Sequence, residues 1–184
     1  MSKLLFLTII INIIFASSPL TLDDIYLKLN IEKTILTDII IIENQNIISI
    51  GQNSLGKEIF ISNKCAIAWN KMHKDALQDS IKISILSGFR SYYKQYQIIQ
   101  NKLNKGMLLE QILKQNKLPG LSQHHSGNAI DIISNSYKLS LDFENSLAYA
   151  WLIENAYKYG FYLTYPKNNK DGIMFEPWHW NLKE

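Results

Sequence analysis

Two short segments of the chain hold residues whose types and spacing could bind a metal ion. The first contains His124 and Asp131, and the second contains Glu176 and His179, three residues apart. Two imidazoles and one carboxylate make a three-ligand metal site that leaves a fourth position for water. A further carboxylate, Glu176, could take a proton from that water. The pattern is typical of a zinc hydrolase, but unrelated core or surface histidines can produce the same spacing.

Each segment needs a particular backbone shape to direct its side chains into one pocket. Gly127 allows a tight bend between His124 and Asp131, and residues 129–133 have the composition of a strand. Glu176 and His179 would point to opposite faces of a regular strand. We therefore expect a turn or bulge between them, where Pro177 has no N–H to donate to a strand partner.

The rest of the sequence predicts an α+β fold with a small central antiparallel sheet flanked by helices. Helices and strands are interspersed without regular strand–helix–strand units. The helices are predicted at 21–31, 63–77, 92–103, 107–116 and 143–159. The strands are predicted at 57–61, 81–86, 129–133, 161–165 and 175–182, with a hairpin at 38–50. There is no repeat or linker, so we expect residues 19–184 to form a single domain.

The N-terminus has the layout of a secretory signal peptide. Lys3 precedes an apolar run over 4–15, and the small residues 16–18 follow. We expect residues 1–18 to direct export to the periplasm or cell envelope, although an uncleaved anchor would have a similar pattern. The run is shorter than the roughly 20 residues of a membrane span, so we expect no stable span after cleavage.

Charge and cysteine content exclude other classes of protein. The net charge is only +3 and is evenly spread, which does not favour nucleic acid as a partner. Cys65 is the only cysteine, so no internal disulfide can form and the core must provide the stability. We expect a monomer.

Two further motifs accompany the candidate metal ligands. The ligand segments read S-x-H-x-x-G-x-A-x-D at 122–131 and E-x-W-H at 176–179. Upstream, residues 87–95 read SGFRSY followed by a glutamine, and 151–166 contain WL, YGF and YP in that order. Together these motifs, which span about 85–182, resemble the VanY-type D-alanyl-D-alanine carboxypeptidases, a family of zinc peptidases. The resemblance implies the α+β fold shared with the hedgehog signalling domain.

The resemblance also assigns roles to particular residues. It implies a zinc ion as cofactor, with three protein ligands: His124, Asp131 and His179. Glu176 would be the general base that activates water and then the acid that protonates the leaving amine. Arg90 would lie near the scissile carbonyl or the terminal carboxylate of the substrate. Gln95 and Ser122 would help to hold that carboxylate.

The implied activity is removal of the terminal D-Ala from peptidoglycan stem peptides. Within the family, an L,D-carboxypeptidase or a peptidoglycan endopeptidase is the alternative. An endopeptidase does not need to hold a free carboxylate, so the set of Arg90, Gln95 and Ser122 favours a carboxypeptidase. Outside the family, a non-haem iron oxygenase or a non-catalytic cell-wall-binding module remains, but Glu176 would have no evident role in either.

The sequence departs from the family pattern at a few positions. Phe89 replaces a tyrosine, Thr164 stands where an arginine is common, and Asp171 stands where a threonine is common. None of these is a predicted ligand or base, so the departures bear on substrate preference. The sequence leaves the roles of His125 and Trp178 open.

Overall fold

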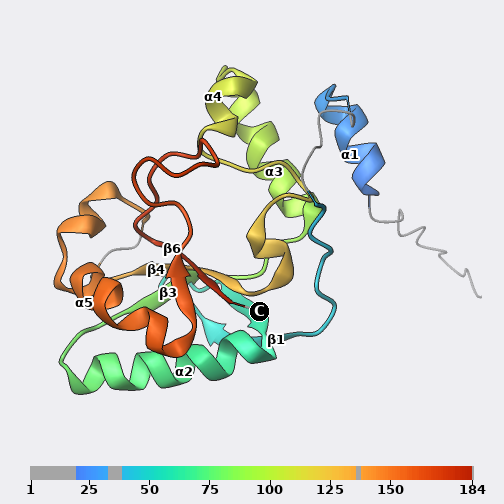
Figure 1. The fold of residues 1–184 in the computed structure, drawn as a ribbon. Coiled ribbons are helices and arrows are strands. Elements are labelled where there is room, and N and C mark those ends of the chain that lie inside the picture. The colour runs from blue at the N-terminus through green and yellow to red at the C-terminus, as the bar shows by residue number, and fades with distance from the viewer. Residues whose placement is uncertain (1–19, 33–38, 136–137, 184) are drawn as a thin grey trace, which may run out of the picture.

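A four-stranded antiparallel sheet lies at the centre of the computed structural model, which describes residues 20–32, 39–135 and 138–183 (Figure 1). Its strand order is β3 (Ser84–Ser87), β4 (Ala129–Ile133), β6 (His179–Leu182) and β5 (Phe161–Leu163). A second, two-stranded sheet pairs β1 (Ile47–Gln52) antiparallel with β2 (Glu58–Ser62). The predicted α+β class with a small antiparallel sheet is therefore confirmed.

Helices flank these sheets. They are α1 (Leu22–Leu29), α2 (Asn63–Gln78), α3 (Tyr92–Leu103), α4 (Leu109–Leu113) and α5 (Leu147–Asn155), with 3-10 turns η2 (Gln123–Ser126), η3 (Leu141–Asn145) and η4 (Ala156–Tyr159). In Figure 1, α2 and α5 lie on one side of the strands, and α3 and α4 lie on the other. The side chains of Ser62 and Ser91 cap α2 and α3, each accepting a hydrogen bond from a backbone N–H of the first turn.

The main core fills the space between the four-stranded sheet and the helices α2 and α5. All five residues of β4 are buried. Ile130 and Ile132 pack in this core with Trp180 of β6. Because side chains alternate along a strand, Asp131 points to the opposite face of the sheet. Cys65 is also buried in the core as a free thiol, and burial raises its pKa to about 12.

A second apolar cluster joins α1 to α3 and α4. Its buried members are Ile25, Tyr26, Leu29, Ile31, Ile99, Ile112 and Leu118. The Tyr26 hydroxyl donates a hydrogen bond of 2.7 Å to the carbonyl of Pro119. This cluster fixes α3 relative to the loop that leads into η2.

The predicted hairpin at 38–50 is wrong. Residues 39–46 form no regular strand, and β1 starts only at Ile47 and pairs with β2. The backbone N–H groups of Ile41 and Asn44 donate instead to the carbonyls of Gly120 and His125, at 2.7 and 2.9 Å. The β-branched composition therefore predicted a strand where the structure has an irregular segment bonded to the loop around η2.

The long helix predicted at 143–159 is divided into η3, α5 and η4. Ser146 interrupts it because its backbone is extended and its side chain accepts a hydrogen bond from the N–H of Tyr149, which starts a new helix. The predicted strands at 161–165 and 175–182 are shorter, at Phe161–Leu163 and His179–Leu182.

The predicted signal peptide, residues 1–18, lies outside the described residues. Within the described ranges, no helix is both long and apolar enough to cross a membrane.

Candidate active site

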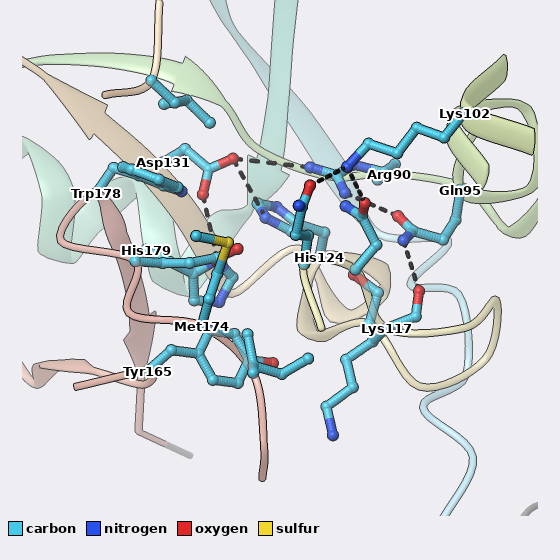
Figure 2. Close-up of a pocket in the computed structure, with 16 residues that line it drawn as sticks. Arg90, Gln95, Lys102, Lys117, His124, Asp131, Tyr165, Met174, Trp178 and His179 are labelled. Carbon is cyan, nitrogen blue, oxygen red and sulfur yellow. Dashed lines mark hydrogen bonds and ion pairs between the residues drawn. The ribbon is translucent and has the colours of Figure 1, made fainter. Parts of the chain in front are cut away.

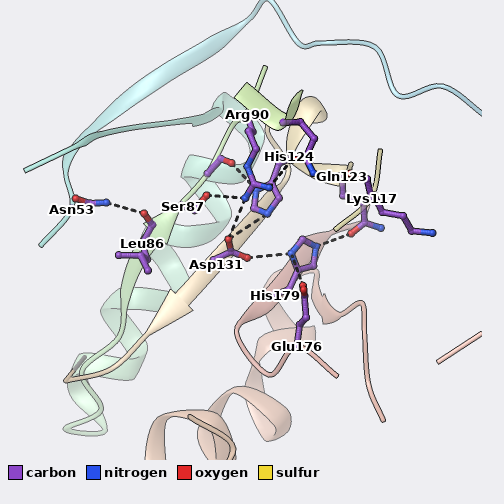
Figure 3. Close-up of polar contacts among 12 residues, drawn as sticks. Asn53, Leu86, Ser87, Arg90, Lys117, Gln123, His124, Asp131, Glu176 and His179 are labelled. Atoms are coloured by element: carbon purple, nitrogen blue, oxygen red, sulfur yellow. Dashed lines mark hydrogen bonds and ion pairs between the residues drawn. The ribbon is translucent and has the colours of Figure 1, made fainter. Parts of the chain in front are cut away.

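Strand pairing brings the predicted ligands together. Asp131 of β4 lies directly opposite His179 of β6 in the antiparallel register. His124 comes from η2, which ends at Gly127 in the left-handed conformation, with φ 72°. One ligand atom from each of the three side chains lies within 4.8 Å of the others, and all three residues are buried (Figure 3). The structure thus assembles the predicted metal-binding set.

Hydrogen bonding fixes the orientation of the His124 ring. Its Nδ1 lies 2.6 Å from the carbonyl oxygen of Gly88, which can only accept, so Nδ1 must carry the proton. Its Nε2 lies 3.4 Å from Oδ2 of Asp131. Burial, with a further contribution from nearby Arg90, lowers the pKa of His124 to about 4. The ring is therefore neutral at physiological pH and directs the Nε2 lone pair toward Asp131.

In the His179 ring the two nitrogens have the opposite roles to those in His124. Its Nε2 lies 3.1 Å from Oε1 of Gln123, and its Nδ1 lies 3.2 Å from Oδ1 of Asp131. The hydroxyl of Thr164 donates to the same Gln123 oxygen at 2.9 Å. With Gln123 oriented in this way, the Nε2–H of His179 donates a hydrogen bond to it, and the lone pair of Nδ1 is free to bind a metal.

The donor set fits a small divalent metal ion such as zinc. Tetrahedral zinc bonds of about 2.0–2.1 Å place neighbouring ligand atoms roughly 3.3 Å apart. His124 Nε2 lies 3.4 Å from Oδ2 of Asp131, and His179 Nδ1 lies 3.2 Å from Oδ1 of the same carboxylate. With one ligand atom from each residue, the three atoms lie within 4.8 Å of one another, which is close enough to share one metal ion. Each ring also donates its other N–H to a protein oxygen, as metal-binding histidines usually do. Although burial opposes ionisation, contacts with His124 and His179 hold the pKa of Asp131 well below its usual range.

Glu176 shares the pocket because a tight turn separates it from His179. The backbone N–H of His179 donates to the carbonyl of Glu176 at 3.1 Å, across the turn at Pro177 and Trp178. Oε2 of Glu176 then lies 3.8 Å from Nδ1 of His179. The predicted irregularity is thus present. Burial raises the pKa of Glu176 to about 7, which suits a group that must accept and return a proton.

A backbone hydrogen bond joins the two ends of the segment at 166–175, which precedes Glu176. The N–H of Glu176 donates to the carbonyl of Tyr165 at 3.1 Å, so residues 166–175 form a loop whose two ends are pinned together. Ile173 and Met174 of this loop line the pocket. The Tyr165 ring packs against His179, with ring centres 4.9 Å apart.

Arg90 extends the polar surface away from the ligands. Its Nη1 donates to Oε1 of Gln95 at 2.7 Å, and its Nη2 lies 3.7 Å from Oδ2 of Asp131. Gln95 is buried and donates from Nε2 to the carbonyl of Lys117 at 2.6 Å. Ser122 lines the same cavity. The structure therefore brings the three predicted substrate-binding residues beside the ligands.

The cavity is open to solvent and has a volume of about 360 Å³ (Figure 2). Trp178 forms part of its wall. Trp180 instead lies in the core and donates from Nε1 to the carbonyl of Pro177 at 3.1 Å. The two tryptophans of the last strand region therefore have different roles.

His125 is a structural residue whose role the sequence did not reveal. It is completely buried, and its Nδ1 donates to the carbonyl of Arg90 at 2.5 Å. Its Nε2 accepts a hydrogen bond of 3.1 Å from the N–H of Gly120. Burial lowers its pKa to about 4, so the ring is neutral and ties the Arg90 segment to the loop before η2. Gln123 was also missed, although its position beside His124 in the motif was a signal.

Comparisons with known proteins agree with this geometry. The family model described as VanY, D-alanyl-D-alanine carboxypeptidase, matches residues 58–183. A D-alanyl-D-alanine carboxypeptidase of Enterococcus faecium is 29% identical over 152 residues, which cover 80% of this chain and 46% of the relative. The chain thus spans about half the length of that curated relative.

Solved structures show the same likeness. The LD-carboxypeptidase LdcB superposes with a TM-score of 0.68 at 32% identity, covering 76% of this chain and 69% of that one. A mutant of the vancomycin-resistance D,D-pentapeptidase VanY in complex with Zn(II) superposes with a TM-score of 0.58 at 27% identity. That match covers 77% of this chain and 82% of the VanY chain.

We predict that Gln123→Leu weakens zinc binding by about 10- to 100-fold, because His179 loses the acceptor that orients its ring. The dissociation constant is measured by competition with a chromogenic chelator. Thr164→Val is the matched control, since it leaves the bond between Gln123 and His179 in place and should have a smaller effect. Unchanged zinc affinity in the Gln123 variant would contradict the proposed orientation.

We predict that His125→Ala lowers the free energy of unfolding by about 2 to 4 kcal/mol, because it leaves a cavity and two unpaired buried backbone groups. Urea unfolding of the metal-free protein measures this loss. His73→Ala, on the partly exposed side of α2, should cost less than about 1 kcal/mol. Equal losses in the two variants would show that His125 has no special structural role.

Proposed function

Because this chain belongs to the VanY family of D-alanyl-D-alanine carboxypeptidases, we propose that it is a zinc-dependent peptidase that removes the terminal D-Ala from peptidoglycan stem peptides. One observation carries the proposal: His124, Asp131 and His179 converge on one point, with Glu176 beside them in an open pocket. The proposed cofactor is zinc, and the proposed ligands are these two histidines and the aspartate. An oxygenase or a simple wall-binding module would not need Glu176.

The residues of the pocket suit hydrolysis of a C-terminal peptide bond. A zinc ion held by the three ligands would polarise the scissile carbonyl and activate water. Glu176 would accept a proton from the attacking water and deliver it to the leaving amine as the carbon–nitrogen bond breaks. Arg90 stays charged in this pocket and offers donors near Asp131. Gln95 and Ser122 would contribute further polar groups to hold the terminal carboxylate.

An L,D-carboxypeptidase is the second candidate. The superposition with LdcB, at a TM-score of 0.68 and 32% identity, exceeds that with the zinc-bound VanY mutant at 0.58 and 27%. The two candidates share the metal site and differ in the residue that precedes the scissile bond. A pentapeptide ending in D-Ala-D-Ala and a tetrapeptide ending in a single D-Ala therefore distinguish them.

The proposal includes export to the cell envelope. A substrate in the peptidoglycan lies outside the cytoplasmic membrane, and the sequence at 1–18 has the pattern of a signal peptide. Fractionation of cells that express the full chain tests this part of the proposal separately from the chemistry.

The decisive experiment incubates the full chain with a muropeptide pentapeptide or tetrapeptide and measures free D-Ala and peptide mass. We expect loss of one D-Ala from the pentapeptide, which stops with a chelator and returns with zinc. Loss from the tetrapeptide alone would establish the second candidate. A cut inside the stem would indicate an endopeptidase, and no cut of either peptide by zinc-loaded protein would refute a carboxypeptidase.

We predict that Glu176→Gln keeps the zinc ion but lowers kcat by about 10²- to 10⁴-fold, because the amide cannot accept the proton. His179→Ala should instead lose zinc. Metal content and peptide hydrolysis are measured on the same preparations. Glu154→Gln, at an exposed position of α5, is the control and should leave both unchanged. Hydrolysis by the Glu176 variant at the wild-type rate would refute the role of Glu176.

A further inference from the structure

Besides Arg90, two lysines that the sequence motifs do not include line the cavity, Lys102 and Lys117, and the side chain of Lys102 is the one that makes contacts within it. Gln95 and Lys102 are seven residues apart on α3, about two helical turns, so they share a face. Helical side chains lean toward the N-terminus of their helix, which directs the long Lys102 side chain back toward Gln95. Figure 2 shows this direction, and both residues line the cavity that contains the metal ligands.

The Lys102 ammonium is held by neutral groups. Its Nζ donates to Oε1 of Gln115 at 2.9 Å and to Oδ1 of Asn116 at 2.5 Å. An ammonium has three N–H donors, so one remains for another acceptor. No carboxylate of the described residues makes an ion pair with it. Burial lowers the pKa of Lys102, whereas the charge of Glu176 raises it.

Arg90 differs from Lys102 in this respect. Its guanidinium already lies 3.7 Å from the Asp131 carboxylate and donates to Gln95. Its charge is therefore partly balanced within the protein, next to the ligands. No carboxylate of the described residues lies within ion-pair distance of Lys102, although the charge of Glu176 acts on it from farther away. The flexible four-carbon stem allows the ammonium to move toward a bound group. A partly desolvated cation without a direct ion pair in a substrate pocket favours an anionic ligand group.

We propose that Lys102 binds the free terminal carboxylate of the peptide substrate, and so makes the site prefer chain ends to internal peptide bonds. This inference rests on the proposed function, since it concerns the same pocket. In this arrangement Arg90 acts closer to the reacting carbonyl, and Lys102 acts at the outer end of the leaving residue. Gln115 and Asn116 position the ammonium.

The experiment compares two peptides that differ only at the terminus, a free D-Ala-D-Ala carboxylate and its carboxamide. Binding is measured by calorimetry on the zinc-loaded full chain that carries Glu176→Gln, in which turnover is slowed enough for binding to be followed. We expect Lys102→Met to weaken binding of the free acid by about tenfold, the effect of losing one charged hydrogen bond, and to leave binding of the amide within twofold. Lys94→Met, exposed on the same helix, is the matched control and should change neither value.

The comparison of acid with amide distinguishes a loss of carboxylate binding from a general structural effect of the substitution. If Lys102→Met weakens the binding of both peptides equally, or weakens neither, the inference is overturned. Lys102→Gln removes the charge but keeps polar contact with the neighbouring amides, and it serves if the methionine variant does not fold. If wild-type protein cuts neither peptide but the acid-specific loss is observed, the inference stands and the proposed hydrolysis fails. If the wild-type protein cuts the free acid but Lys102→Met does not weaken binding of that acid, only the inference about Lys102 fails.

Discussion

The register between β4 and β6 is the constraint on which the site depends. Asp131 and His179 are direct cross-strand partners, so a shift of one residue would turn His179 away from the pocket. The same strands bury Ile130, Ile132 and Trp180 on their other face. Burial of that apolar face therefore keeps Asp131 and His179 opposite each other. The pairing of β4 with β6 thus forms both part of the hydrophobic core and part of the candidate metal site.

Backbone and amide oxygens then complete the orientation of the two rings. Gly88 supplies the carbonyl for His124, and it has no room for a side chain, because an added Cβ would lie 2.5 Å from the carbonyl oxygen of Phe60. The close approach of β2 to this glycine keeps the carbonyl in place. Gln123 performs the corresponding role for His179. These hydrogen bonds restrict both rings to one orientation, which favours metal affinity because fewer side-chain conformations have to be frozen on binding.

The sequence predicted which residues gather at the candidate metal site, and the turn at Pro177, because both depend on residue type and local spacing. Strand and helix types were largely correct for the same reason. The partner of residues 39–46 was not predictable, since β-branched composition indicates extended backbone but not which backbone it contacts. The roles of His125 and Lys102 depend on contacts with residues distant in the chain, so a local pattern could not reveal them.

The closed base of the loop at 166–175 has a consequence for how such a site can diversify. The hydrogen bond between Tyr165 and Glu176 closes this loop off from the candidate metal ligands, while Ile173 and Met174 line the cavity. The length and composition of the loop can therefore change without moving His124, Asp131 or His179. For the proposed peptidase, changes in this loop would alter which peptides fit the cavity, while the sheet keeps the candidate metal ligands in place.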